Sequence, residues 1–271
     1  MPLVTSKYRA PLLLSNPHLQ TILPAILRQV SGISFRRERV PTPDDDFLDV
    51  DLLTSSSKRI ALLVHGLEAS TDSGYIRGMA KKLYGEGWLV AAMNLRGITH
   101  APYELHSTYH SGATHDVNTV VNFLLQKFPC DEMVLIGFSL GGNQVIKYAG
   151  ENEFQLDSRI KKAIGISVPC DLKATARNLD STKKFYGRIF LRSLKSRVKL
   201  FHERLPFPLA AKDIDQIETL EEYDDVYTAP MFGFKNAEDY YDRCSAKKFI
   251  GGVKIPLLIL SAKDDPFFTA E

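Results

Sequence analysis

Residues 132–142 read EMVLIGFSLGG, and this stretch decides the fold. An apolar run leads directly into Ser139, and a segment compatible with a helix, residues 140–149, follows it at once. A Gly-x-Ser-x-Gly motif between a strand and a helix is the context of a nucleophile elbow, a strained turn that exposes the serine hydroxyl. Because the turn is tight, Gly137 and Gly141 must be small. We predict that Ser139 is a nucleophile; the alternative is a glycine-rich turn with an inert serine.

Short apolar runs alternate with longer amphipathic segments along the rest of the chain. Continuous apolar runs suit strands buried on both faces, and their alternation with helices predicts a mostly parallel α/β sheet covered on both sides. The predicted buried strands are residues 59–64, 88–93, 132–138, 160–168 and 255–262. The predicted helices between them are residues 74–84, 115–128 and 140–149. Two edge strands are predicted at residues 34–40 and 47–53.

The stretch from residue 170 to residue 234 breaks this alternation. It holds no clear strand, and residues 171–205 carry ten Lys and Arg against three Asp and Glu. We interpret it as a helical cap over the carboxyl ends of the strands, where open α/β sheets bind ligands. The predicted organisation is a core formed by residues 1–169 and 235–271, with the cap, residues 170–234, inserted between its two parts.

The overall composition excludes several classes of protein. With a formal net charge of +2 over 271 residues, the chain gives no reason to expect a nucleic-acid partner. Its three cysteines form no CxxC pair, and no Cys/His cluster has zinc spacing, so a structural metal is not predicted. Nucleophilic chemistry at a serine needs neither a metal nor an organic cofactor, so none is expected. No apolar stretch is long enough for a signal peptide or a membrane span, which predicts a soluble, cytoplasmic protein.

A second motif is a candidate for the same site as Ser139. His65-Gly66-Leu67 ends the first buried strand, and in hydrolases with such a sheet an HG motif there precedes a loop that supplies an oxyanion-hole amide. Acyl transfer places negative charge on the carbonyl oxygen, so we predict that the backbone N–H groups of Leu67 and Leu140 bind it. His65 itself is interpreted as a structural histidine that bonds to loop backbone.

An acidic pair follows the last apolar run. Asp265 lies at the offset from Pro256 at which typical hydrolases carry the acid that orients the catalytic histidine. Asp264 is interpreted as a turn or capping residue, and the alternative is that both carboxylates merely cap a turn. The hydrolase order is Ser, acid, His, yet no histidine follows His202. The catalytic histidine is therefore expected beyond Glu271, and the last strand and helix of the fold are expected to be missing.

Several motifs in this order resemble the AB hydrolase 4 family, which includes YheT-like bacterial esterases and eukaryotic abhydrolase-domain lipases. The resemblance covers nearly the whole chain, and its motifs are NPHLQT at 16–21, HGL at 65–67, NLRG at 94–97, YHSG at 109–112, FSLGGN at 138–143, FGF at 232–234 and AKDDPF at 262–267. It implies an α/β-hydrolase fold and cleavage of carboxylic esters by a Ser-His-Asp triad through an acyl-enzyme. Ser139 and Asp265 carry over as nucleophile and acid. The substrate does not carry over, because members act on esters from short acyl chains to phospholipids.

Two alternatives stay open. The rival to an esterase is a non-catalytic module of the same fold that binds an acyl ligand or a protein partner. In the cap, Phe185 and Phe190 lie among basic residues. The preferred interpretation of that pattern is a lid helix with a solvated basic face, and the alternative is contact with an anionic membrane surface. The predicted partner is a small ester or lipid substrate.

Overall fold

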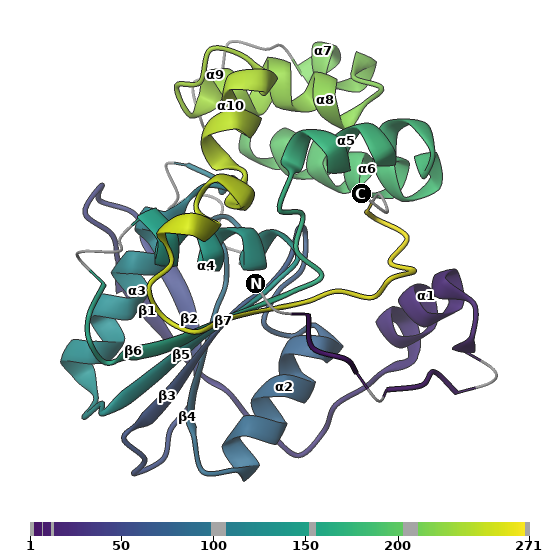
Figure 1. The fold of residues 1–271 in the computed structure, drawn as a ribbon. Coiled ribbons are helices and arrows are strands. Elements are labelled where there is room, and N and C mark those ends of the chain that lie inside the picture. Colours follow the sequence, from purple (N-terminus) through teal and green to yellow (C-terminus); the bar gives the residue numbers. More distant parts are fainter. Residues whose placement is uncertain are drawn as a thin grey trace.

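The computed structural model in Figure 1 describes residues 3–6, 8–11, 14–98, 107–151, 156–202 and 211–268. These residues form a twisted sheet with helices against it and a separate layer of helices at one end of the strands. The strands are β1 (Arg36–Pro41), β2 (Phe47–Leu53), β3 (Arg59–Val64), β4 (Leu89–Met93), β5 (Glu132–Phe138), β6 (Ile160–Ile166) and β7 (Leu257–Leu260). The helices that follow strands of the core are α2 (Gly74–Gly85), α3 (Thr114–Lys127) and α4 (Leu140–Glu151).

The strand order in the sheet is β1-β2-β4-β3-β5-β6-β7. The pairs β1–β2 and β2–β4 are antiparallel, and every other pair is parallel. The predicted α/β-hydrolase fold with a mostly parallel sheet is therefore confirmed. The carboxyl ends of β3, β5 and β6 lie side by side, which brings together segments that are far apart in the sequence.

The two faces of the sheet bury alternate side chains of the same strand, as the period of two requires. Leu62 and Val64 of β3 belong to the hydrophobic cluster that includes α3 and α4. Leu63, between them, belongs to the cluster on the other face, where it is joined by Ile76 and Ala80 of α2. Helices therefore cover both faces, and burial of this apolar surface is the main source of stability.

The predicted strands and helices are present, with two differences. Residues 47–53 form an inner strand rather than an edge strand, because β1 pairs with the outer side of β2 and all seven residues of β2 are buried. β7 is shorter than residues 255–262 and lies at the other edge of the sheet, where Leu258 and Leu260 are 47% and 51% exposed. A further strand beside this edge stays a prediction.

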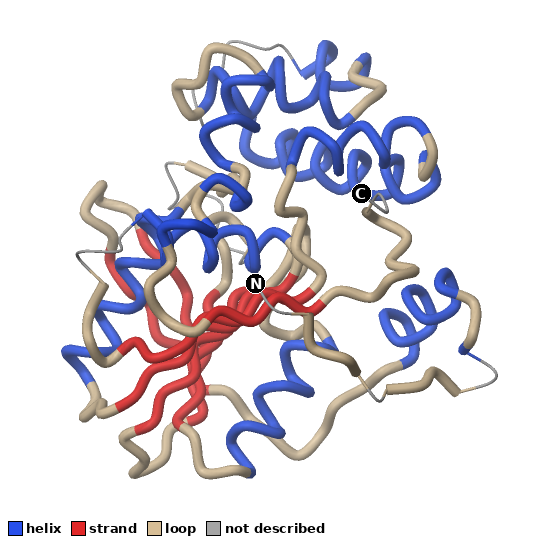
Figure 2. Tube along the Cα trace, in the orientation of Figure 1, coloured by secondary structure: helices blue, strands red, loops and turns tan. Residues whose placement is uncertain are grey.

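The described residues of the expected cap form helices joined by short loops and contain no strand, as Figure 2 shows. Its elements are α5 (Leu172–Ser181), α6 (Lys184–His202), α7 (Ala211–Gln216), α8 (Leu220–Tyr223), a π-helix (Asp224–Thr228), α9 (Ala229–Met231) and α10 (Ala237–Cys244). Side chains from α5, α6, α7, α8, the π-helix and α10 share one hydrophobic cluster. Two 3₁₀ turns, Ala246–Lys248 and Ile250–Gly252, lead back from this layer to β7. The boundaries at residues 170 and 234 stay predictions, since α10 begins beyond residue 234 and still packs with the cap.

The NPHLQT motif at residues 16–21 forms the start of α1 (Pro17–Leu27) and attaches it to the cap. The Asn16 side chain caps the helix by accepting the backbone N–H groups of His18 and Leu19. The Nδ1 atom of His18 lies 2.8 Å from the hydroxyl of Tyr186 on α6. This motif therefore places α1 beside the cap rather than in the core.

Two kinds of feature are absent from the part of the chain that the structure describes. No helix there has both the length and the apolar composition needed to cross a bilayer. Nor do three or more His, Cys, Asp or Glu side chains come together there in an arrangement that would hold a metal ion.

Candidate active site

Ser139 lies in the tight turn between β5 and α4, and its backbone has a φ of 51°. This left-handed conformation is uncommon for a residue with a side chain and is the strain expected of a nucleophile elbow. A Cβ atom at Gly137 would lie 2.2 Å from the carbonyl oxygen of Gly141, and one at Gly141 would lie 2.4 Å from that of His65. The packing of the elbow therefore requires both glycines, as the sequence predicts.

Leu67 and Leu140, whose N–H groups are the predicted oxyanion donors, line the same cavity as Ser139. Leu140 is the first residue of α4, where the N–H has no partner within the helix and the helix dipole favours negative charge. Within the described residues, neither N–H donates a hydrogen bond. A Cβ atom at Gly66 would lie 3.0 Å from the Cβ of Ser139, so the loop after β3 approaches the elbow closely.

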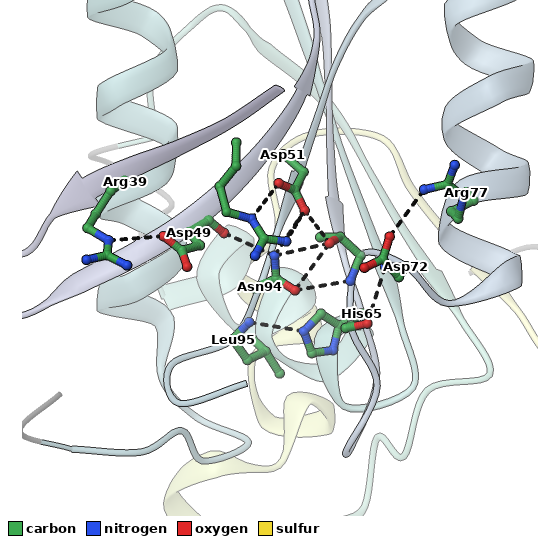
Figure 3. A network of polar contacts seen from close by, with 11 residues as sticks. Arg39, Asp49, Asp51, His65, Asp72, Arg77, Asn94 and Leu95 are labelled. Carbon is green, nitrogen blue, oxygen red and sulfur yellow. Dashed lines mark hydrogen bonds and ion pairs between the residues drawn. The ribbon is translucent and has the colours of Figure 1, made fainter. Parts of the chain in front are cut away.

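His65 supports the loop after β3 and uses both of its ring nitrogens to do so. Nδ1 lies 2.8 Å from the carbonyl oxygen of Gly66, and Nε2 accepts the N–H of Leu95 at 3.0 Å (Figure 3). Burial lowers the pKa of His65 to about 4, so the ring is neutral and carries its proton on Nδ1. The interpretation of His65 as a structural histidine is confirmed.

A buried polar network fixes the far end of the same loop to β2 and β4 (Figure 3). The carboxylate of Asp51 accepts the Thr71 hydroxyl, and it also accepts Asn94 Nδ2 at 3.3 Å. The Arg37 guanidinium donates to both oxygens of Asp51, each at 2.8 Å. Asn94 Oδ1 in turn accepts the N–H of Thr71 at 3.1 Å. The NLRG motif at residues 94–97 thus contributes to holding the loop that presents Leu67.

Asp265 lies in the turn after β7, and two donors hold its carboxylate. Oδ2 accepts the hydroxyl of Ser167 at 2.5 Å, and Oδ1 accepts the N–H of Phe267 at 3.0 Å. Ser167 directly follows Ile166, whose carbonyl oxygen accepts the N–H of Ser139 at 2.8 Å. The end of β6 therefore joins the turn that carries the candidate acid to the elbow that carries the candidate nucleophile.

His110 lines the cavity with Ser139 but is hydrogen-bonded elsewhere. Its Nδ1 accepts the N–H of Gly112 at 3.1 Å, and burial, followed by the positive charge of nearby groups, lowers its pKa to about 3. No histidine side chain that the structure describes hydrogen-bonds to Ser139 or Asp265. Outside the described side chains are those of His100, His106 and His202. A catalytic histidine beyond the last residue stays a prediction.

A cavity of about 130 Å³ lies between the cap and the strand ends, with Ser139 in its wall. On the cap side its wall is mostly apolar and is built by residues of α5 and α6, namely Leu172, Thr175, Ala176, Leu179, Phe190, Leu194, Arg197 and Val198. Phe267 and Phe268 line it from the segment after β7. A largely apolar cavity with a few polar groups is the usual form of a small-molecule site.

Another part of the cavity wall is polar and comes from the π-helix and α10. The carboxylate of the half-buried Asp224 accepts the hydroxyls of Thr228 and Tyr241, both at 2.7 Å. Burial raises the pKa of Asp224 to about 7, against these two donors, which lower it. Such a group in a cavity wall is a candidate binding residue. Its acidic neighbourhood in the sequence gave no indication that this one carboxyl lines the cavity.

Sequence reasoning missed three residues that hold the site together. Ser167 positions Asp265, and Glu68 ties the loop of Leu67 to the cap. Asn143 donates from Nδ2 to the carbonyl oxygens of Ser111 at 2.9 Å and Cys244 at 2.8 Å, which joins α4 to the YHSG segment and to α10. Asn143 belongs to the FSLGGN motif, which is a signal that could have identified it. No local pattern marks Ser167 or Glu68.

The sheet topology and the elbow define the class, and the chain belongs to the α/β-hydrolase fold family, whose profile matches residues 62–271. It is 32% identical to the Escherichia coli (strain K12) protein named "Putative esterase YheT", over 93% of this chain and 76% of that protein. It is 31% identical to the monoacylglycerol lipase of Saccharomyces cerevisiae, over 85% of this chain and 52% of that protein. The chain thus spans about half the length of the yeast protein.

A solved structure shares the fold. The esterase Pf2001 of Pyrococcus furiosus is 18% identical and superposes with a TM-score of 0.51, over 87% of this chain and 86% of that chain. At this level of identity the likeness concerns the backbone architecture alone. The site must be argued from the residues of this chain.

Proposed function

We propose that the protein is a serine hydrolase that cleaves carboxylic esters, with Ser139 as the nucleophile and Asp265 as the acid of its triad. The observation that carries this proposal is the left-handed backbone of Ser139 in the wall of an apolar cavity. The relatives named as an esterase and a lipase support the reaction class. The position of Asp265, held by two donors and joined to the elbow through β6, supports its role.

In the proposed reaction, Ser139 Oγ attacks the ester carbonyl carbon while a histidine takes the hydroxyl proton. The N–H groups of Leu67 and Leu140 stabilise the charge on the carbonyl oxygen. The same histidine then protonates the leaving alcohol, and the acyl group stays on Ser139. Water, deprotonated by that histidine, attacks the acyl-enzyme and releases the carboxylic acid. We propose that the histidine comes from sequence that follows Glu271, in keeping with the order Ser, acid, His.

For the substrate, we propose an ester whose acyl chain packs against the wall formed by α5 and α6. Leu172, Phe190 and Leu194 give this wall its apolar character, and burial of each methylene of a chain is worth about 0.8 kcal/mol. The names of two relatives, a yeast monoacylglycerol lipase and the mouse phospholipase ABHD3, refer to lipid esters. The polar wall around Asp224 suits a substrate whose other end carries hydrogen-bonding groups.

For the partner, we propose that the exposed face of α6 contacts an anionic lipid surface. Phe185 and Ile189 are 64% and 51% exposed there, and Lys184, Arg188 and Arg192 are exposed among them. The ion pairs that α6 forms with described residues, those of Arg197 and Lys199, involve other side chains of the helix, so none of the described carboxylates pairs with these three charges. An amphipathic surface of this composition favours the membrane interface. The structure thus gives the membrane interpretation more support than the sequence does.

The test of the proposed function is turnover of p-nitrophenyl esters by the full-length protein and its Ser139→Ala variant. Loss of a triad serine should lower kcat by several orders of magnitude while the melting temperature changes little. Hydrolysis by the variant at the parental rate would show that Ser139 is not the nucleophile.

A further inference from the structure

Glu68 occupies an unusual position directly after Leu67, the proposed oxyanion donor. Its backbone has a φ of 53°, a left-handed conformation that costs energy for a residue with a side chain. Its side chain is 5% exposed, although it carries a carboxylate. A charged side chain is buried in this way only when other groups compensate its charge. The neighbours of Glu68 therefore determine the conformation of the loop.

Two of these neighbours come from the cap helix α6. Arg197 donates to the carboxylate through Nε at 2.8 Å and through Nη2 at 3.1 Å, so that each oxygen of Glu68 receives one bond. The hydroxyl of Ser193, one helical turn earlier, donates to the second oxygen at 2.6 Å. Arg197 also donates to the carbonyl oxygen of Gly97, in the loop after β4. One helix of the cap thus holds two loops at the carboxyl end of the sheet.

The third neighbour comes from the YHSG segment. The hydroxyl of Tyr109 donates to Glu68 at 2.7 Å and accepts the backbone N–H of Glu68 at 3.0 Å. Burial alone would raise the pKa of Glu68, but Arg197 and the two hydroxyl groups outweigh it and lower that pKa. Both members of the Glu68–Arg197 pair are therefore charged at neutral pH, and they form an ion pair in which the Glu68 side chain is 5% exposed and that of Arg197 is 20% exposed. A guanidinium that bonds to both oxygens of a carboxylate fixes the relative orientation of the two side chains. Removing one partner would leave the charge of the other without compensation.

We propose that Glu68 and Arg197 are positioning residues through which the cap holds the oxyanion loop in its active geometry. Glu68 directly follows Leu67 in the chain, so a displacement of the Glu68 backbone also shifts Leu67 and the N–H group that would bind the oxyanion. The oxyanion hole is then complete only while α6 lies over the sheet, and displacement of the cap dismantles it. This inference rests on the proposed function, because it concerns the N–H that would bind the oxyanion.

The test compares two conservative variants in the full-length protein. Glu68→Gln removes the charge at nearly constant size, and Arg197→Lys keeps the charge but cannot bond to both oxygens in the same way. The matched control is Lys199→Met, also on α6, which breaks the exposed pair of Lys199 with Asp215 on α7. Three readouts are measured: the burst rate of acylation per active site, the affinity for a boronic acid, and the affinity for a long-chain alcohol.

We expect the acylation rate and the affinity for the boronic acid to fall together by roughly 10- to 100-fold in both variants. A small misplacement of an oxyanion donor lowers reaction rates by a factor of this order. The boronic acid forms a tetrahedral adduct that needs the oxyanion hole, whereas the alcohol only fills the cavity. The affinity for the long-chain alcohol should therefore stay near the parental value. The Lys199→Met control should match the parent in all three readouts. The double variant should be no slower than the slower single variant, because the two residues act as a unit.

Several outcomes would overturn the proposal. Parental acylation rates per active site in both variants, with only a lower melting temperature, would show a purely structural ion pair. An equal loss of alcohol affinity would show that the two residues shape the cavity wall instead. Additive losses in the double variant would show that they act separately. A parent protein that is not acylated at Ser139 would refute the proposed function itself, whereas an acylated parent with unaffected variants would refute the positioning role alone.

Discussion

The hydroxyl of Ser167 donates a hydrogen bond of 2.5 Å to the carboxylate of Asp265 from a backbone with a φ of 51°. A left-handed conformation costs a residue with a side chain roughly 1 to 2 kcal/mol. The N–H of Ser167 is bonded to the carbonyl oxygen of Leu260 at 2.8 Å, at the end of β7. The strained turn after β6 therefore fixes the carboxylate relative to the elbow.

From this relationship we expect Asp265→Asn to be far more damaging than Asp264→Asn. Asp265 is held in place for the orienting role, and an amide there would favour the wrong histidine tautomer, which in serine proteases lowers kcat about 10⁴-fold. Asp264 is exposed, so its substitution should leave kcat within a factor of about two. Steady-state kinetics of the two full-length variants provide the check. Equal losses, or a greater loss for Asp264→Asn, would contradict the assignment of the acid.

The elbow should be intolerant of a single added methyl group. Gly141→Ala would place its Cβ atom 2.4 Å from the carbonyl oxygen of His65 and 2.5 Å from that of Val64, and both are backbone atoms that cannot move aside. We expect a loss of about 1 to 3 kcal/mol in the free energy of unfolding, as for overpacked cores, or failure to fold. Urea denaturation measures the difference.

The matched control for that substitution is Gly85→Ala. Gly85 is the last residue of α2, and an added Cβ would meet nothing within 4 Å. Because alanine favours helix over glycine, we expect unchanged or slightly higher stability. If Gly141→Ala were as stable as Gly85→Ala, the tight packing of the elbow described above would be wrong.

Phe190 should influence the choice of acyl chain, because it lines the cavity and contacts Phe267 with ring centroids 5.8 Å apart. Phe190→Ala removes apolar wall that a long chain would contact and a short chain would not reach. We expect kcat/KM to fall roughly 3- to 30-fold for long-chain esters, the range for one or two methylene contacts, and to change little for acetate esters. A parallel loss for both substrates would indicate that Phe190 only supports the fold.

Phe185 should affect membrane binding rather than acyl-chain choice, since it is exposed on α6 beside the exposed basic residues Lys184, Arg188 and Arg192. We expect Phe185→Ala to leave the hydrolysis of dissolved esters unchanged but to weaken binding to vesicles of phosphatidylcholine with phosphatidylglycerol. Replacing Lys184, Arg188 and Arg192 by glutamine should weaken that binding roughly tenfold or more, since each charge is worth about 1 kcal/mol. Vesicle sedimentation measures both effects. Equal binding of parent and variants, or equal binding to pure phosphatidylcholine vesicles, would contradict a basic lipid-binding face.

The sequence predicts the core well because its signals are local. The apolar run before Ser139, the two glycines of the elbow and the helix after it all lie between Glu132 and Glu151, and their packing follows from that order. The inner position of β2 could not be read in the same way. Whether a strand is at the edge depends on which strands pair beside it, and β2 pairs with β1 and β4 rather than with its successor β3.

The supports of the site could not be predicted because they join distant parts of the chain. Ser167 and Asp265 are 98 residues apart, and Glu68 and Arg197 are 129 residues apart. A serine after a strand and a glutamate in a loop are common, and each acquires its role from a partner that the fold brings to it. The motifs identified the groups proposed for chemistry, whereas the structure identified what holds them.

The most direct measurement of the central claim is covalent labelling of the full-length protein with a fluorophosphonate, followed by peptide mass spectrometry. An activated serine next to an oxyanion hole reacts with such a probe, whereas an ordinary serine hydroxyl does not, because it is almost wholly protonated at neutral pH. We predict a single adduct on Ser139, lost in the Ser139→Ala variant and slowed in Asp265→Asn. Absence of labelling in the folded protein, or an adduct on another residue that persists in Ser139→Ala, would contradict the assignment of Ser139 as the nucleophile.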